Sequence, residues 1–161
     1  MKKVLLVFAL LLIVIGAILL AQKYLKINIF SLPGKNSTAA ITTVTINNYT
    51  FKVKVAKSQK EQEIGLSETD QLPQDQGMIF IFDKPDYYSF WMKNMKFPID
   101  IIYINNDKIV TVKSNAQPLV KQENPIIYKP TDPTDKVLEI NAGLSKKYNF
   151  EKDDKVIIQN L

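Results

Sequence analysis

Apolar and polar side chains alternate along the chain from about residue 41, and this period of two limits the fold more than any other feature. Val44 and Ile46 alternate with threonines, and after Asn47-Asn48 a second run has apolar side chains at Tyr49, Phe51, Val53 and Val55. Successive side chains of a strand point to opposite faces of a sheet, so both runs are typical of strands with one buried face. Because Asn tolerates a positive φ in a tight turn, the pattern predicts a β-hairpin.

The rest of this region also predicts short strands. Further strands are expected at residues 78–82, 88–92, 99–104, 108–113, 137–140 and 156–159. A second hairpin turn is expected at 105–107. Ser58 and Glu61 form the capping-box pattern of a short helix, and another short helix is expected at 142–148. No helical pattern is long enough for a βαβ crossover, so we predict a mostly antiparallel β-sandwich or barrel with one or two short helices.

An apolar segment without a charged residue runs from Val4 to Ala21, 18 residues in all. It reaches the lower end of the ~17–25 residues that span a bilayer as a helix, and it exceeds the ~7–15-residue apolar core of a cleaved signal peptide. No small-x-small cleavage pattern follows it. We therefore predict a transmembrane helix as a membrane anchor at 1–25, a tether at 26–42 and a β-rich domain at 43–161.

Lysines stand on both sides of this segment, Lys2 and Lys3 before it and Lys23 and Lys26 after it. That symmetry weakens the argument from the positive-inside rule. We expect a single pass through the cell membrane with the large domain outside. Secretion after signal cleavage, and an inverted anchor with the domain in the cytoplasm, stay open as alternatives.

The sequence contains no Cys, His or Arg, and all 21 basic residues are Lys. This excludes a Ser-His-Asp triad, a thiol nucleophile, the usual zinc ligands and a bidentate guanidinium clamp. Asp132 and Asp135 lack the dense ligand series of a calcium loop, so no metal or other cofactor is expected.

The net charge of +5 comes from the N-terminal region. Five lysines and no acid precede residue 44, whereas 16 lysines and all 16 acidic residues follow it. The predicted domain is therefore neutral, and we do not expect a nucleic acid as its partner. The membrane is the partner expected of the N-terminal segment.

Six short motifs occur in order along the predicted domain: GL at Gly65, LP at Leu72, GM at Gly77, FWMKN at Phe90–Asn94, PID at Pro98–Asp100 and LEINAG at Leu138–Gly143. The series resembles the bacterial and archaeal family called domain of unknown function 192, from about Val44 to the C-terminus. The resemblance implies a compact β-rich, jelly-roll-like domain that is often exported or membrane-anchored, and it implies no particular reaction. One departure is that Ser67 and Glu68 follow GL, where the family commonly has a methionine and a basic residue.

The segment FWMKNMKFPID combines the only Trp of the chain with polar side chains. If Trp91, Lys93, Asn94 and Asp100 line one cleft, they offer an aromatic face, an ammonium, an amide and a carboxylate, which suit a sugar or a peptide. Alternatively, the strand ends at Met92, Lys93-Asn94 form a turn and Trp91 belongs to the core. Both interpretations stay open at this point.

Glu139 and Tyr128 complete the candidate ligand-binding residues. Glu139, between Leu138 and Ile140, is either an inward acid of a polar network or a solvent-facing residue of a strand. Tyr128 lies in a Pro-rich loop predicted at residues 114–135, where it either covers a cleft or anchors the loop to the core.

We predict a non-catalytic binding module for a cell-envelope saccharide or peptide, because the pattern offers an aromatic and polar cleft without an activated nucleophile. No catalytic residue is assigned. Two alternatives remain. One is a hydrolase, with Asp100 and Glu139 as a carboxylate pair or with a buried Lys93 as base or nucleophile. The other is a factor that assists the assembly or stability of a membrane partner.

Overall fold

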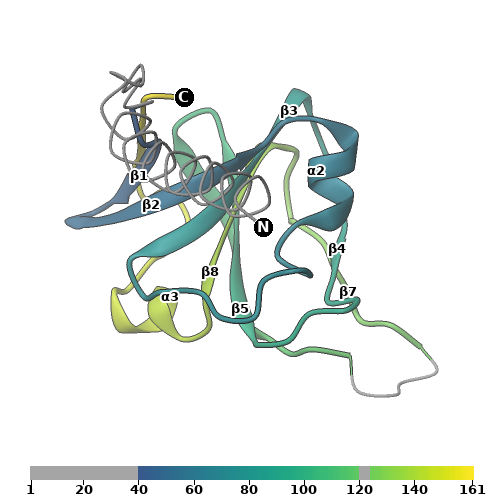
Figure 1. Cartoon of the computed structure of the whole chain (residues 1–161). Coiled ribbons are helices and arrows are strands. Elements are labelled where there is room, and N and C mark those ends of the chain that lie inside the picture. The colour runs from purple at the N-terminus through teal and green to yellow at the C-terminus, as the bar shows by residue number, and fades with distance from the viewer. Residues whose placement is uncertain (1–39, 120–123) are drawn as a thin grey trace, which may run out of the picture. The chain divides into compact units, whose positions relative to one another are not determined.

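The computed structural model of the chain describes residues 40–119 and 124–161 (Figure 1). The predicted membrane anchor at 1–25 and the predicted tether up to residue 39 lie outside this range. Neither helix inside it has the length and apolar character needed to cross a bilayer.

The described residues form nine strands and two short helices (Figure 1). The strands are β1 (Thr43–Ile46), β2 (Tyr49–Ala56), β3 (Gln76–Asp86), β4 (Phe90–Trp91), β5 (Ile99–Asn105), β6 (Lys108–Ala116), β7 (Ile127–Tyr128), β8 (Thr134–Asn141) and β9 (Val156–Gln159). The helices are α2 (Gln59–Ile64) and α3 (Leu144–Lys147). The prediction of a mostly β fold with one or two short helices is confirmed.

Seven strands form a single curled sheet in the order β6-β5-β8-β3-β2-β1-β9, and β4 and β7 pair as a separate ribbon. The first and last strands are neighbours, with Thr43 of β1 opposite Gln159 of β9. The two edges of the sheet meet where Lys108 of β6 and Lys155, just before β9, form an antiparallel bridge. The seven strands thus form one sheet that curls into a half-barrel, and they do not form the two face-to-face sheets of a sandwich.

Both predicted hairpins are present, and each turns at an asparagine in the left-handed region. Asn47 (φ 54°) joins β1 to β2, and Asn106 (φ 55°) joins β5 to β6. Asn adopts this conformation at little cost because its short polar side chain can bond locally. The predicted capping box is also present: Ser58 Oγ accepts a hydrogen bond from the Glu61 N–H, and the Glu61 carboxylate accepts one from the Ser58 N–H.

One neighbouring pair, β2 and β3, is parallel, whereas the other pairs in the sheet are antiparallel. Our prediction that no βαβ crossover would occur is wrong at this point. Residues 57–75 make the connection, with α2 as its helical part, and a parallel crossover needs only about a dozen residues. Gly65 (φ 51°) ends α2 and reverses the chain, so a helix of six residues is sufficient.

The central strands β3, β5 and β8 are buried on both faces. Ile79 and Leu138 point into the curl of the sheet and belong to one hydrophobic cluster. Phe80 and Ile101 point to the opposite side, which we call the outer face, and belong to a second cluster. The alternation follows from the strand period of two. Because both faces of β3 are covered here, every residue of Met78–Phe82 is apolar.

The outer face is covered by the segment after α2 and by the β4–β7 ribbon. Leu66 and Met92 are buried in the cluster of the outer face, and Phe90 and Tyr128 pack against it while partly buried. A polar side chain that points outward from a central strand is therefore removed from water. This layer of cover positions the candidate site.

Several predicted boundaries differ from the structure, and two of the differences lie around the β4–β7 ribbon. The strand expected at 88–92 is only Phe90–Trp91, because Lys93 and Asn94 (φ 59°) form a turn. The loop expected at 114–135 is interrupted by β7, and β6 and β8 extend into it. The first change lengthens the irregular segments next to β4, whereas the second shortens those next to β7.

Candidate functional site

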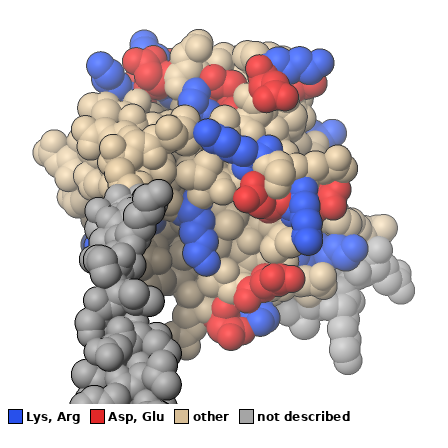
Figure 2. All heavy atoms as spheres, turned by 45° about the horizontal axis from the view of Figure 1, so that its top comes forward, with Lys and Arg blue, Asp and Glu red and all other residues tan. Residues whose placement is uncertain are grey.

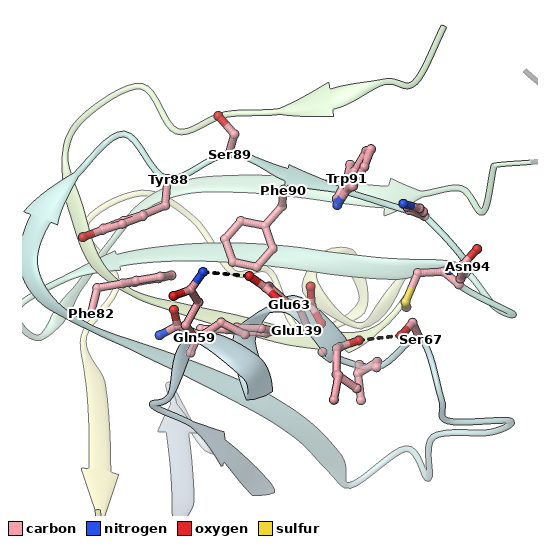
Figure 3. Close-up of a pocket in the computed structure, with 17 residues that line it drawn as sticks. Gln59, Glu63, Ser67, Phe82, Tyr88, Ser89, Phe90, Trp91, Asn94 and Glu139 are labelled. Carbon is pink, nitrogen blue, oxygen red and sulfur yellow. Dashed lines mark hydrogen bonds between the residues drawn. The ribbon is translucent and has the colours of Figure 1, made fainter. Parts of the chain in front are cut away.

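A pocket of about 540 Å³ lies on the outer face of the sheet (Figure 3). Its lining comes from α2 and the turn after it, from β3, from β4 with the residues that flank it, and from β8. Figure 3 shows Phe90 projecting from β4 toward Glu63 of α2 and Glu139 of β8, and Ser89 projecting the opposite way. Small-molecule sites usually measure ~300–1,000 Å³, so the pocket is large enough for a ligand group.

Aromatic rings form the apolar part of the pocket. Phe82 and Tyr88 stack with 3.6 Å between ring centroids and 11° between ring planes. Phe90 packs edge-on against Phe80 at 5.0 Å and against Tyr103 at 5.9 Å. Stacked and edge-to-face contacts hold aromatic rings in defined orientations. The apolar wall is therefore formed before any ligand arrives.

Glu139 places a carboxyl group in the apolar environment of this pocket. It lies in the middle of β8, opposite Met78 of β3 and Ile101 of β5, and only 6% of the residue is exposed. No described residue donates a hydrogen bond to its buried Oε2. Burial raises the pKa of the Glu139 carboxyl to about 8, because the charged form is poorly solvated there. Glu139 is thus buried and not solvent-facing, but its Oε2 takes part in no polar network among the described residues.

A hydrogen bond below the pocket ties the ribbon to the sheet. The Tyr103 hydroxyl donates to the Tyr128 carbonyl at 2.9 Å. Burial, and to a smaller extent the nearby Glu139, raises the pKa of the Tyr103 hydroxyl well above its usual value. Tyr128 pairs with Phe90 across the ribbon and does not line the pocket. Tyr128 therefore anchors its segment to the core, as one of our two interpretations held.

Polar side chains of α2 form the opposite wall. Gln59 Nε2 donates to Glu63 Oε1 at 2.8 Å, one helical turn along the exposed face (Figure 3). Gln62 Nε2 donates to the Ile81 carbonyl at 2.8 Å and so holds α2 against β3. The wall is completed after the helix by Ser67, whose Oγ donates to the Ile64 carbonyl at 2.6 Å.

Trp91, Lys93 and Asn94 also line the pocket. Trp91 is 50% exposed, so its assignment to the core is wrong, whereas the turn at Lys93-Asn94 is present. Lys93 is exposed, and its Nζ lies 4.9 Å from the centroid of the Trp91 ring. The hypothesis of a buried catalytic Lys93 is therefore wrong, because an exposed amine is not desolvated.

Asp100 lies apart from the pocket and has a structural role. Its carboxylate is fully buried and accepts hydrogen bonds from three backbone N–H groups, those of Asn115 at 2.7 Å, Gly143 at 3.0 Å and Ser145 at 2.8 Å. These contacts hold the end of β6 and the start of α3 together. The predicted placement of Asp100 in the cleft is wrong.

Sequence reasoning missed Gln59, Glu63, Phe82 and Phe90 as pocket residues. The first two depend on the parallel crossover that brings α2 to β3, which we did not predict. Phe90 was part of the FWMKN motif, and its alternation with Trp91 was the signal that could have identified it. No cluster of metal-ligating side chains occurs within residues 40–119 and 124–161.

Comparison with solved structures finds two similar chains. A protein of unknown function from Novosphingobium aromaticivorans is 35% identical, with a TM-score of 0.63 over 73% of this chain and 83% of that chain. A Sinorhizobium meliloti protein, described as a candidate transcription regulator, is 27% identical, with a TM-score of 0.67 over 74% of this chain and 93% of that chain. Comparison with curated proteins finds no match.

Residues 42–158 match the model of a family described as Uncharacterized ACR, domain of unknown function 192. The matched range includes every strand and helix given above and the whole lining of the pocket, apart from the last residue of β9. The resemblance that the motifs indicated is thereby confirmed, and this chain belongs to the domain of unknown function 192 family.

Proposed function

We propose that the domain is a non-catalytic binding module that takes a polar group of a peptide or saccharide into the pocket between α2 and β4. The observation that carries the proposal is the buried Oε2 of Glu139, which lacks a hydrogen-bond partner among the described residues of an otherwise apolar floor. Buried polar atoms are nearly always paired in folded proteins, because an unpaired one costs about 1–3 kcal/mol. A ligand that pairs with Glu139 recovers this energy.

The pocket also has the composition of a recognition site. Ring faces supply apolar contact, while Gln59, Glu63 and Asn94 supply a few polar groups around the entrance. Orientation by few polar groups on an apolar wall is the usual design of small-ligand sites. The exposed Trp91 at the edge adds a surface on which a ligand can stack.

We further propose that the N-terminal apolar segment holds this domain at the outer surface of the cell membrane. Support comes from the uncharged run from Val4 to Ala21 and from the neutral charge balance after residue 44. Figure 2 shows lysine and acidic side chains interspersed on one face of the domain, which is unlike a nucleic-acid-binding surface of a single sign. A role in transcription, as described for the Sinorhizobium meliloti protein, is therefore not our choice.

A second candidate function is glycoside hydrolysis, because two carboxyl groups, Glu63 and Glu139, line the same pocket in different surroundings. Glycosidases use one protonated and one ionised carboxyl group across a cleft. Glu139 is buried with a raised pKa, and Glu63 is exposed on α2. Release of reducing sugar from an oligosaccharide panel, and its loss in Glu63→Gln, would favour this function over simple binding.

A glycan and peptide array tests the binding proposal. The compact unit Ala40–Leu161 is compared with Glu139→Leu and with Lys152→Ala, which removes an exposed lysine outside the pocket. We expect retained ligands for the unaltered unit and Lys152→Ala, and loss for Glu139→Leu with an unchanged circular dichroism spectrum. Absence of any retained ligand for the unaltered unit would refute the proposal.

A further inference from the structure

We propose that the group taken into this pocket is a primary alkylammonium, as carried by the side chain of lysine in a peptide. The inference rests on the proposed function and names the chemistry of its ligand. It depends on the groups around the pocket floor: two carboxyl groups, several aromatic faces and a lysine that is already turned outward.

The electrostatic character of the floor favours a cation. Glu139 and Glu63 both line the pocket, and so do the rings of Phe82, Tyr88 and Phe90. Aromatic faces carry partial negative charge and attract ammonium groups. An anionic ligand would meet two acids here, whereas an ammonium gains charge-assisted hydrogen bonds to Glu139.

The protein itself does not supply this cation within the part of the chain that the structure describes. None of the four ion pairs there involves Glu139 or Glu63. Lys93 is the lysine of the pocket lining, and its ammonium lies over the Trp91 ring at the exposed edge. Among the described residues, Glu139 Oε2 therefore has neither a cation nor a hydrogen-bond donor as its partner.

The depth of the carboxyl group selects the shape of the ligand. Only 6% of Glu139 is exposed, so the ammonium must reach it on a narrow apolar stem. The four methylene groups of lysine form such a stem, and they can lie along Phe90 and Phe80. An amino sugar carries its ammonium directly on a hydroxyl-bearing ring, so reaching the floor would bury unpaired hydroxyls.

Proton linkage follows from the same arrangement. At neutral pH the neutral Glu139 carboxyl must release its proton to the solvent when the ammonium binds, which leaves a carboxylate paired with the cation. The other titratable groups around Glu139 are Glu63 of α2, Tyr88 and Lys93 beside β4, and Tyr103 of β5; β3 contributes the uncharged Met78. We therefore expect tighter binding as the pH rises toward 8.5, because a smaller fraction of the Glu139 carboxyl groups is then protonated and has to release a proton.

The test uses the full chain and the fluorescence of Trp91, which is the only tryptophan and lies at the edge of the pocket. The probes are N-acetyl-lysine methylamide, its uncharged counterpart N-acetyl-norleucine methylamide, and glucosamine. Each is titrated at pH 6.5 and 8.5 into the unaltered chain, Glu139→Gln and Lys152→Ala, the last of which removes an exposed lysine outside the pocket.

We expect the lysine probe to bind the unaltered chain about tenfold or more tightly than the norleucine probe, because only the former makes a charge-assisted contact. The dissociation constant should fall on the order of tenfold from pH 6.5 to 8.5, as Glu139 ionises more readily. Glu139→Gln should lose both the preference and the pH dependence, and Lys152→Ala should keep both.

Each other outcome overturns the inference in a distinct way. Equal binding of the lysine and norleucine probes would refute the ammonium while leaving a ligand-binding pocket. Tighter binding of glucosamine than of the lysine probe would refute the requirement for an alkyl stem. Unchanged Trp91 fluorescence with all three probes would refute the inference outright. An unchanged lysine preference in folded Glu139→Gln, with folding checked by circular dichroism, would also refute it. The array described above decides separately whether the domain binds a ligand at all.

Discussion

Asp100 and Glu139 lie on adjacent strands, one residue out of register, and therefore point to opposite faces of the sheet. Asp100 is paired with Ile140, and Glu139 is paired with Ile101. Directly opposite residues of paired strands share a face, and a shift of one residue places a side chain on the other face, so the two carboxyl groups cannot act on one substrate. The hydrolase with an Asp100 and Glu139 pair is excluded, and the two acids have separate roles.

Asp100→Ala should destabilise the domain by about 3 kcal/mol or more, because three backbone N–H groups, of which that of Ser145 is buried, lose their carboxylate acceptor. Urea unfolding followed by circular dichroism measures the change. Asp70→Ala is the control: Asp70 is exposed and pairs with Lys96, and such ion pairs contribute about 0–1 kcal/mol. Equal stability of both variants would contradict the structural role of Asp100.

The stability of the unaltered domain should decrease with pH because of Glu139. Its pKa is about 8 in the folded state and near 4.5 when exposed, so the folded state holds one more proton between these values. Stability from this group is complete below about pH 4.5, falls by ~1.4 kcal/mol per pH unit, and is lost above about pH 8.

Glu139→Gln should remove this slope, so the two proteins should differ more in unfolding free energy at pH 8 than at pH 5. Glu63→Gln, on the exposed face of α2, should retain the slope of the unaltered protein. Parallel pH profiles for the unaltered chain and Glu139→Gln would show that Glu139 titrates normally in the folded state.

Phe90→Ala and Trp91→Ala should separate the core from the exposed edge of the pocket. Phe90 packs edge-on against two rings, so its loss should cost about 2–3 kcal/mol. Trp91 is half exposed, and its loss should cost less than about 1 kcal/mol. Denaturation is followed by circular dichroism, since Trp91→Ala removes the fluorophore. A larger loss of unfolding free energy for Trp91→Ala than for Phe90→Ala would indicate that Trp91 is a core residue.

Gly77→Ala should destabilise the domain by about 2 kcal/mol or more. A Cβ at this position would lie 2.6 Å from the Glu139 carbonyl oxygen, and backbone on neighbouring strands cannot move away cheaply. Gln76→Ala at the start of the same strand serves as the control and should change stability by less than about 1 kcal/mol. Thermal unfolding of both variants checks this, and equal melting temperatures would contradict the close approach of β3 and β8.

Glu151→Cys should react with a membrane-impermeant maleimide in intact cells, if the domain lies outside as we propose. Glu151 is exposed, and the chain has no Cys of its own, so any label reports this single position. Labelling after lysis only would indicate the inverted orientation. Recovery of the labelled protein from the medium would indicate secretion after cleavage.

The local parts of the fold could be predicted from the sequence because short-range geometry decides them. The hairpins at Asn47 and Asn106 and the capping box of Ser58 and Glu61 each depend on residues within about ten positions. The parallel pairing of β2 with β3 depends on where a loop of 19 residues returns, between Ala56 and Gln76, and no local pattern encodes that.

The candidate site was predictable only in part, for the same reason. Four of the six candidates, Trp91, Lys93, Asn94 and Glu139, line one pocket, and whether they bind a ligand stays a prediction. Asp100 was misplaced because each acid in an apolar strand looks alike until the register between strands is known. Glu63 was missed because α2 reaches the pocket only through the crossover.

The pairing of β1 with β9 also sets when this domain can fold. The ribosome makes β1 early and β9 last, so the edge of the hairpin at Thr43 has no partner until translation nears residue 159. Until then the nascent polypeptide lacks this hydrogen-bonded partner along β1, so the native edge of the sheet is completed only when β9 has been made.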